Sequence, residues 1–152
     1  MLKCLEFELP AIFDNRIWDI LEVTNMQKYY WRIIKEQSEV WCEKTNTDFF
    51  RKTDYSGVEF KKQLRDNCRI NFLKLQVYES YLSNTFELHT YTDFLLSDCK
   101  FIVLLYDNIF VEIYAKEHDI IKTLQSAAQD KQCLNINLIS EKNFSRTKMD
   151  IL

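Results

Sequence analysis

The chain has 152 residues, of which 47% are hydrophobic and 28% are charged, and its formal net charge is −3 at pH 7. This length and composition exclude global disorder and predict one domain that spans residues 1–152. The slightly acidic balance gives no general attraction to nucleic acid or to an anionic membrane, so we expect neither as a partner. No apolar run approaches the ~20 residues that cross a bilayer, and the acidic N-terminal stretch does not resemble a signal peptide, which predicts a cytoplasmic protein.

The chain contains a single glycine, Gly57. Phosphate-binding loops, dinucleotide-binding turns and nucleophile elbows use glycines where the backbone approaches a ligand or turns sharply, so the sequence excludes these enzyme sites. The five cysteines are widely spaced without a C-x-x-C pair, and there are two histidines. We therefore expect reduced thiols, no metal site and no cofactor.

The first predicted elements are a strand and a helix. Leu5, Phe7 and Leu9 alternate with glutamates over residues 2–9, which is typical of a strand with one buried face. Pro10 ends this strand. Apolar residues then recur at helical spacing and predict a helix over about residues 12–23.

Two further strands are predicted at residues 29–34 and 39–42, joined by a polar turn. Their aromatic density has two interpretations: a surface that binds a partner, or large side chains that fill both faces of a small sheet, which is the commoner case. The candidate partner surface consists of Tyr29, Tyr30, Trp31 and Trp41.

The middle of the chain combines a capped helix with a strand. Ser56 and Glu59 form a capping-box pattern, which predicts a helix that ends near Asn67. Residues 70–78 predict a strand in which Lys74 and Gln76 face water, followed by a shorter strand at residues 86–88.

The apolar runs 101–106 and 109–115 flank Asp107-Asn108 and predict a β-hairpin, because Asp and Asn tolerate the positive φ of tight turns. Residues 101–106 are apolar throughout, so this hairpin is expected to form the buried middle of the sheet. A short helix capped at Thr90 precedes it. A helix with acidic residues in its first turn and a final strand from residue 134 follow it.

These elements predict an α+β fold: a single domain with a mainly antiparallel sheet of five to seven strands and two or three helices packed on one side.

No residue set forms a convincing catalytic group. Asp54, Glu59 and Lys61 match the letters of a metal-dependent nuclease, but Glu59 already has a role in the capping box. His118 starts a helix and lacks the further ligands of a metal phosphohydrolase, and Cys99 precedes a core strand without a flanking glycine to expose it.

Several short motifs resemble a small family of uncharacterised proteins from Bacillus-related Firmicutes, catalogued as a domain of unknown function. The motifs are residues 7–10, the Tyr30-Trp31 pair, residues 97–99, the Tyr106-Asp107 pair, residues 111–114 and residues 145–147. The resemblance covers nearly the whole chain and implies a cytoplasmic bacterial protein, with no activity to carry over. Residues 45–83 match no pattern of the family, and the role of Arg146 in the C-terminal tail is left open.

The sequence thus favours a small cytoplasmic non-enzymatic binding protein whose partner is another protein. Two alternatives stay open: a metal-dependent hydrolase or nuclease, and an immunity-type inhibitor of a bacterial toxin. The oligomeric state is open as well.

Overall fold

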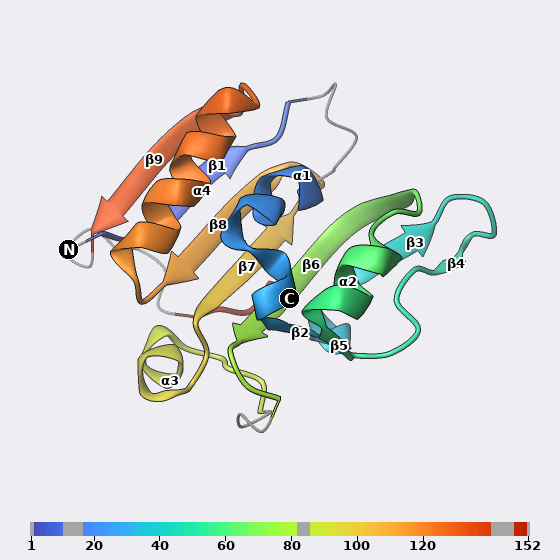
Figure 1. Cartoon of the computed structure of the whole chain (residues 1–152). Coiled ribbons are helices and arrows are strands. Elements are labelled where there is room, and N and C mark those ends of the chain that lie inside the picture. The colour runs from blue at the N-terminus through green and yellow to red at the C-terminus, as the bar shows by residue number, and fades with distance from the viewer. Residues whose placement is uncertain (1, 11–16, 82–85, 141–147, 152) are drawn as a thin grey trace.

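The computed structural model describes residues 2–10, 17–81, 86–140 and 148–151 (Figure 1). The strands are β1 (Leu2–Glu8), β2 (Tyr30–Ile33), β3 (Glu39–Cys42), β4 (Thr47–Asp48), β5 (Asp54–Ser56), β6 (Cys68–Tyr78), β7 (Phe101–Tyr106), β8 (Phe110–Ala115) and β9 (Leu134–Ser140). The α-helices are α1 (Trp18–Leu21), α2 (Gly57–Gln63), α3 (Tyr91–Leu96) and α4 (His118–Asp130). Short 3₁₀ turns occupy residues 22–24, 26–28 and 35–37.

The strands form one antiparallel sheet in the order β4-β3-β6-β7-β8-β1-β9, and β2 pairs with β6 and β5. The described residues thus form nine strands, so the prediction of five to seven is wrong. The difference comes from β4 and β5, which have two and three residues and are too short to give a periodic signal.

The β7–β8 hairpin lies in the middle of this order, as predicted. Asp107 and Asn108 have left-handed φ of 51° and 67°, and with Ile109 they form the three-residue loop between the paired residues Tyr106 and Phe110. Residues 101–105 are almost completely buried, so this strand is covered on both faces.

The longest strand, β6, joins β2 and β3 to the rest of the sheet. One of its edges pairs with β7, and the other pairs with β3 along its first half and with β2 along its second half. The strands β2 and β3 therefore lie one after the other along β6. The register against β3 shifts between Ile70 and Phe72, which marks a β-bulge.

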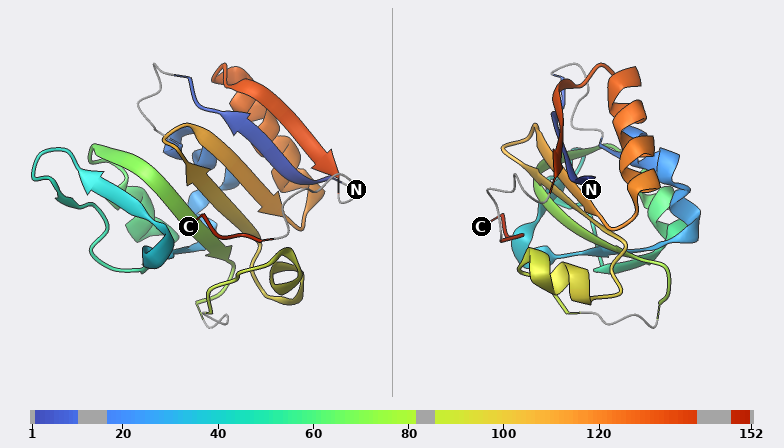
Figure 2. Two further views of the ribbon diagram at one scale, coloured as in Figure 1. Left: turned by 180° about the vertical axis from the view of Figure 1, so that it is seen from behind. Right: turned by 90° about the vertical axis from the view of Figure 1, so that its left-hand side faces the viewer.

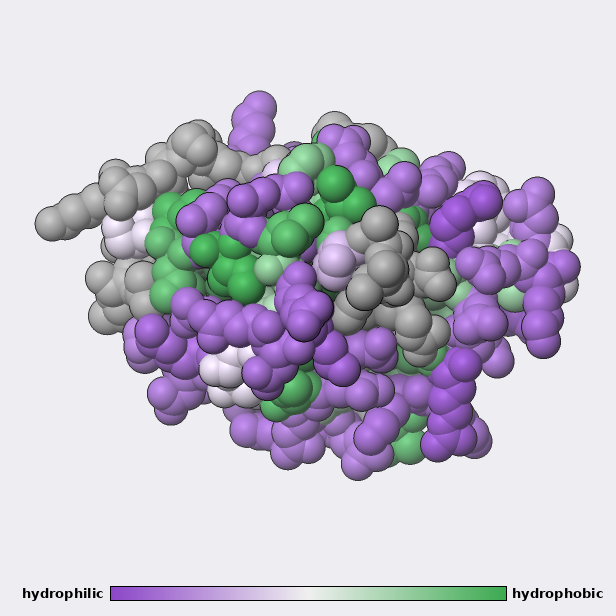
Figure 3. Space-filling model, turned by 90° about the horizontal axis from the view of Figure 1, so that it is seen from above, coloured by the Kyte–Doolittle hydropathy of each residue, from purple (hydrophilic) through white to green (hydrophobic). Residues whose placement is uncertain are grey.

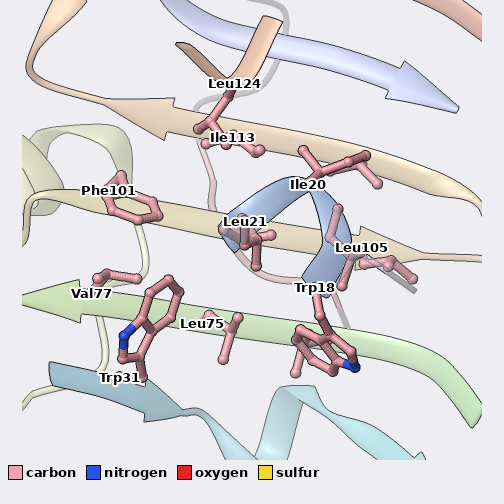
Figure 4. Packing of buried hydrophobic residues seen from close by; sticks show 14 of the residues in the cluster. Trp18, Ile20, Leu21, Trp31, Leu75, Val77, Phe101, Leu105, Ile113 and Leu124 are labelled. Carbon is pink, nitrogen blue, oxygen red and sulfur yellow. The ribbon is translucent and has the colours of Figure 1, made fainter. Parts of the chain in front are cut away.

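The first face of the sheet carries the main core, which α1, α2 and α4 cover (Figures 1 and 2). Trp31 stacks on Phe60 at 4.8 Å between ring centroids, and Trp18 meets the edge of the same ring at 5.8 Å. Figure 4 shows Trp31 over the strands of the sheet, beside Val77 and near Phe101. The buried stripe of α4 consists of Ile120, Ile121, Leu124, Ala127 and Ala128.

The second face of the sheet is covered as well, which corrects the prediction that all helices pack on one side. Helix α3 packs there, on the opposite side from α4 (Figure 2), and buries Phe94. The C-terminal segment at residues 148–151 also lies on this face and buries Met149. As a consequence Lys74 and Gln76, predicted to face water, are both 0% exposed.

Two other predictions need correction or have only partial support. Residues 86–88 do not form a strand and instead run as an extended segment toward α3. The predicted helix over residues 12–23 lies partly outside the described residues, and its described part is α1 followed by a 3₁₀ turn that ends at Asn25 with φ of 59°. Among the described residues, no helix is long and apolar enough to cross a membrane.

Candidate functional site

The four aromatic residues predicted as a partner surface occupy different environments. Trp31 is 0% exposed and donates its indole N–H to the carbonyl of Met26 at 3.0 Å, and Tyr29 is also buried. Tyr30 and Trp41 are partly exposed but lie on β2 and β3 and line different pockets. Of this set, Tyr30 is the member that lies among other accessible aromatic residues.

Tyr30 lines a pocket of about 120 Å³ at the end of β2 and β6. Its ring packs against Tyr81, with centroids 5.7 Å apart. The polar wall of the pocket is the Arg32–Asp54 pair, joined by two parallel hydrogen bonds of 2.7 and 2.8 Å across β2 and β5. This bidentate pairing holds both side chains in fixed positions.

A second pocket, of about 530 Å³, lies between the extended segment at residues 86–88 and α3. Phe86 and Leu96 supply apolar walls, and Glu87, Asp93 and Asp98 supply carboxylates. Lys116 lies behind this pocket: its ammonium sits 5.1 Å from the centre of the Phe94 ring and bonds the Ser97 carbonyl.

The side chains around the two pockets are unusually exposed for apolar residues. Tyr81 is 68% exposed, Phe86 72%, Leu95 40% and Leu96 84%. These four belong to the seven large hydrophobic residues that are exposed in the described part of the chain. Together with Tyr30 we call them the apolar surface: Tyr30, Tyr81, Phe86, Leu95 and Leu96.

Gln76 is a buried residue of β6 that forms hydrogen bonds to one residue of each pocket. Its side-chain amide donates to the hydroxyl of Tyr78 at 2.9 Å and to the carbonyl of Phe86 at 3.0 Å, and its oxygen accepts from the amide of Leu88 at 2.8 Å. Tyr78 lines the first pocket and Phe86 the second. The buried amide therefore fixes the position of one pocket relative to the other.

Next to Gln76 on the same strand face, Lys74 forms the centre of a buried ionic cluster. Its ammonium donates to the carbonyl of Leu88 at 2.5 Å and to Asp150 at 3.3 Å, and it lies 3.9 Å from Glu87. His89 Nδ1 lies 2.8 Å from Glu87 and 3.1 Å from Asp150. The cluster thereby joins β6, the segment before α3 and the C-terminal segment.

The pKa values in this cluster follow from burial and pairing. Burial lowers the pKa of Lys74, and the carboxylates of Glu87 and Asp150 oppose that change. Burial raises the pKa of Asp150, but hydrogen bonds from His89 and Lys74 outweigh it, so the pKa of Asp150 is lowered overall.

Glu87, His89 and Asp150 bring potential metal-ligand atoms within 4.8 Å of one another. However, both carboxylates already face the Lys74 ammonium, which supplies the positive charge that they require. A divalent cation would have to bind beside this ammonium and would be repelled by it. We therefore assign these residues a structural role.

A second buried carboxylate, Glu112 on β8, lies on the same face of the sheet. The hydroxyls of Tyr106 and Tyr114 each donate to it at 2.6 Å. It faces Glu6 across the β1–β8 pairing, and both line a pocket of about 200 Å³. The two tyrosine hydroxyls supply hydrogen bonds to a carboxyl group that would otherwise be costly to bury.

The residues tested for metal-dependent hydrolysis have separate structural roles. Both carboxylate oxygens of Asp54 bind Arg32. Glu59 accepts from the Ser56 amide, as the predicted capping box requires, and also from Lys52. Cys99 is 0% exposed, and burial raises the pKa of its thiol to about 12. His118 is the first residue of α4. Arg146 lies outside the described residues.

The sequence did not identify Lys74, Gln76 and Glu112 as buried, although all three are polar residues of the core strands. Each sits at an alternating position of a strand, where a polar residue normally marks the water-facing side. The available signal was the pattern that follows β6, because Leu88 and Phe94 need an apolar surface to pack on.

A family model described as a protein of unknown function (DUF2691) matches residues 2–150. The chain is 29% identical over 156 residues to the uncharacterized protein YncE of Bacillus subtilis (strain 168), covering 99% of this chain and 100% of that relative. No solved structure matches the chain. These findings confirm the resemblance to an uncharacterised family with Bacillus members, and they name no activity or partner.

Proposed function

The chain belongs to the DUF2691 family of proteins of unknown function, and from its own site we propose that it is a small non-enzymatic binding protein that recognises another protein through the apolar surface. The single observation that carries the proposal is the exposure of Tyr81, Phe86 and Leu96 at two pockets that Gln76 links, with exposed Leu95 next to Leu96 on α3. Large apolar side chains that gather on a surface are a common mark of protein-binding sites.

The charges beside the apolar surface indicate the chemistry of the partner. Glu87, Asp93 and Asp98 line the second pocket together with Phe86 and Leu96. A partner segment with a lysine or arginine next to an apolar side chain would match both the carboxylates and the apolar walls. An immunity-type inhibitor that blocks a basic toxin is one form of such an interaction.

The rigidity of the site also favours binding. Gln76, Lys74 and the Arg32–Asp54 pair fix the walls of the pockets through hydrogen bonds among themselves and with the backbone. A preformed surface loses little conformational freedom when a partner binds. The proposed location is the cytoplasm, because the five cysteines are widely spaced without a C-x-x-C pair, as is usual where disulfides are rare.

The test is affinity capture from a lysate of the native host with three forms of the purified protein. The site variant is Phe86→Ser with Leu96→Ser, which removes two exposed apolar side chains without entering the core. The matched control is Val58→Ser, because Val58 is 62% exposed on the distant helix α2.

We expect one stoichiometric protein to bind the unaltered chain and the control, and to be lost with the site variant. Binding should then be reproduced with the purified partner. The proposal is contradicted if no protein is captured, or if the captured protein binds all three forms equally.

A further inference from the structure

Two cysteines meet where β3 ends and β6 begins. Cys42 is the last residue of β3, Cys68 is the first residue of β6, and the two lie directly opposite each other in the antiparallel pairing of these strands. The register shift of this pairing lies earlier, between Glu39 and Val40, so the pairing is regular from Val40 to Cys42. Both cysteine side chains are half-buried against the main core.

The two thiols point to the same face of the sheet. Val40 and Ile70 lie two positions away on the same strands, are opposite each other, and belong to the main core. Side chains two positions apart in a strand share a face, so Cys42 and Cys68 point to this face as well. The two cysteines are far apart in the sequence, and therefore no spacing motif indicates the pair.

This placement meets the geometric condition for a disulfide. Opposite Cα atoms in antiparallel strands are about 4.5–5.5 Å apart. Disulfide-bonded cysteines have Cα atoms roughly 4.4–6.8 Å apart. The two sulfur atoms can therefore approach each other by rotation about χ1, without displacement of either strand.

Cys42 is the more reactive member on which oxidation can begin. It precedes the exposed turn at residues 43–46 and lines a pocket of about 320 Å³ with Thr45 and Thr47. Figure 3 shows mostly hydrophilic side chains at this end of the molecule, where β3 and β4 lie. Hydrogen bonds from the Thr45 side chain and from the backbone of Thr45 and Lys44 lower the pKa of the Cys42 thiol. A lower pKa increases the fraction of thiolate, which is the form that oxidants attack.

The other three cysteines lack both properties. Cys4, Cys99 and Cys133 are buried, and burial raises the pKa of each thiol. Among the described strand pairings, the one between β3 and β6 alone places two cysteines opposite each other. Oxidation should therefore be selective for Cys42 and Cys68.

From this juxtaposition we propose that Cys42 and Cys68 are a redox-modification site and form a reversible disulfide when they meet a peroxide. The Cys42 thiolate attacks one oxygen of hydrogen peroxide and the O–O bond breaks, which leaves a sulfenic acid on Cys42 and releases hydroxide. The Cys68 thiol then attacks the Cys42 sulfur, the S–O bond breaks, and the departing hydroxide takes the thiol proton to form water. In total the two thiols lose two electrons and two protons, and one hydrogen peroxide is reduced to two water molecules.

A transient disulfide of this kind fits a compartment in which permanent disulfides are rare. The bond joins the end of β3 to the start of β6, across the segment that carries β4, β5 and α2. The apolar surface lies toward the opposite end of β6, where Tyr78 and Tyr30 line their pocket. The redox proposal therefore does not rest on the proposed function.

The test treats the reduced full-length chain with hydrogen peroxide, blocks the remaining thiols by alkylation, and analyses the peptides by mass spectrometry without reduction. The unaltered chain should give a cross-linked peptide pair that contains residues 42 and 68, and dithiothreitol should separate it. In Cys68→Ser, Cys42 should accumulate about tenfold more sulfenic acid, trapped with dimedone, because no second thiol consumes it. Cys133→Ala is the control and should form the disulfide at an unchanged rate. Circular dichroism verifies that both variants are folded.

Three results would overturn the proposal. The first is a folded chain in which peroxide leaves Cys42 and Cys68 reduced. The second is oxidation of Cys42 that gives no bond to Cys68, or gives a bond to another cysteine or another chain instead. The third is a Cys68→Ser variant that accumulates no more sulfenic acid on Cys42 than the unaltered chain does.

Discussion

The ammonium of Lys74 and the carboxylate of Asp150 lie 3.3 Å apart, although 76 positions separate the two residues in the chain. Lys74 is 0% exposed, so its charge depends on this contact and on the Leu88 carbonyl. One side chain from the longest strand thus holds both the segment before α3 and the C-terminal segment against the second face of the sheet. These two segments carry or support the apolar surface.

Replacing Lys74 by methionine should therefore destabilise the protein. The change keeps the apolar stem but leaves the carboxylates of Glu87 and Asp150 without their cation. We expect the unfolding free energy to fall by about 3 kcal/mol. This value is near the low end for a broken buried ion pair, because both carboxylates retain some contact with water. Lys28→Met is the control, since Lys28 is exposed and 3.8 Å from Glu79, and it should cost less than about 0.5 kcal/mol. Equal losses in urea unfolding would refute the role of Lys74.

The only glycine should be required for close packing. A Cβ atom at Gly57 would lie 2.3 Å from the carbonyl oxygen of Met26 and 2.5 Å from the Cα atom of Gln27. Because both neighbours are backbone atoms, they cannot rotate away, and Gly57→Ala should cost about 2 kcal/mol or more. Thermal unfolding checks this prediction; an alanine variant as stable as the unaltered chain would mean that α2 and the turn at residues 26–28 can separate without cost.

The cysteines should react at very different rates. Hydrogen bonds from Thr45 and from the Lys44 amide lower the pKa of the Cys42 thiol, whereas burial raises the pKa of Cys99 to about 12 and that of Cys133 to about 11. Cys42 should therefore be labelled first by a thiol reagent in the native protein. Peptide mass spectrometry after short exposure identifies the modified residue, and labelling of Cys99 as fast as that of Cys42 would contradict the burial described here.

Acid should weaken the start of α2. Hydrogen bonds from Lys52 and from the Ser56 amide lower the pKa of Glu59 from 4.5 to about 2. The folded protein therefore binds this proton more weakly than the unfolded chain does. The resulting stabilisation is complete above about pH 4.5 and is lost as the pH falls toward 2.

The corresponding measurement compares unfolding of the unaltered chain and of Glu59→Gln across this pH range. Their difference in stability should shrink as the pH falls, because the unaltered carboxyl becomes neutral as well. Glu43→Gln, in the exposed turn after β3, serves as the control substitution. A difference that stays constant with pH would show that the Glu59 carboxylate does not cap α2.

The sequence predicted those parts of the fold in which local chemistry determines the structure. Asp107-Asn108 specifies the hairpin turn, and Ser56 with Glu59 specifies the start of α2, since both act within four residues. The second covered face was not predicted, because it depends on contacts between distant segments. Lys74 has the pattern of a water-facing residue, and its burial is made favourable by Glu87, Asp150 and the carbonyl of Leu88.

The candidate site was predictable to a similar degree. The sequence identified Tyr30 within an aromatic stretch, but it could not separate Tyr30 from Trp31, which alternates to the opposite face of β2 and enters the core. Phe86 and Leu96 read as ordinary core residues, and their exposure follows from how the segment around α3 crosses the end of the sheet.

The central claim is that the apolar surface binds another protein, and site-specific photocrosslinking in living cells tests it most directly. A photoreactive amino acid is placed at Leu96, which is 84% exposed, and in a parallel strain at Val58, which is 62% exposed. We predict one discrete adduct with a different polypeptide from position 96 and none from position 58. Absence of an adduct at position 96, or the same adducts from both positions, would contradict the claim.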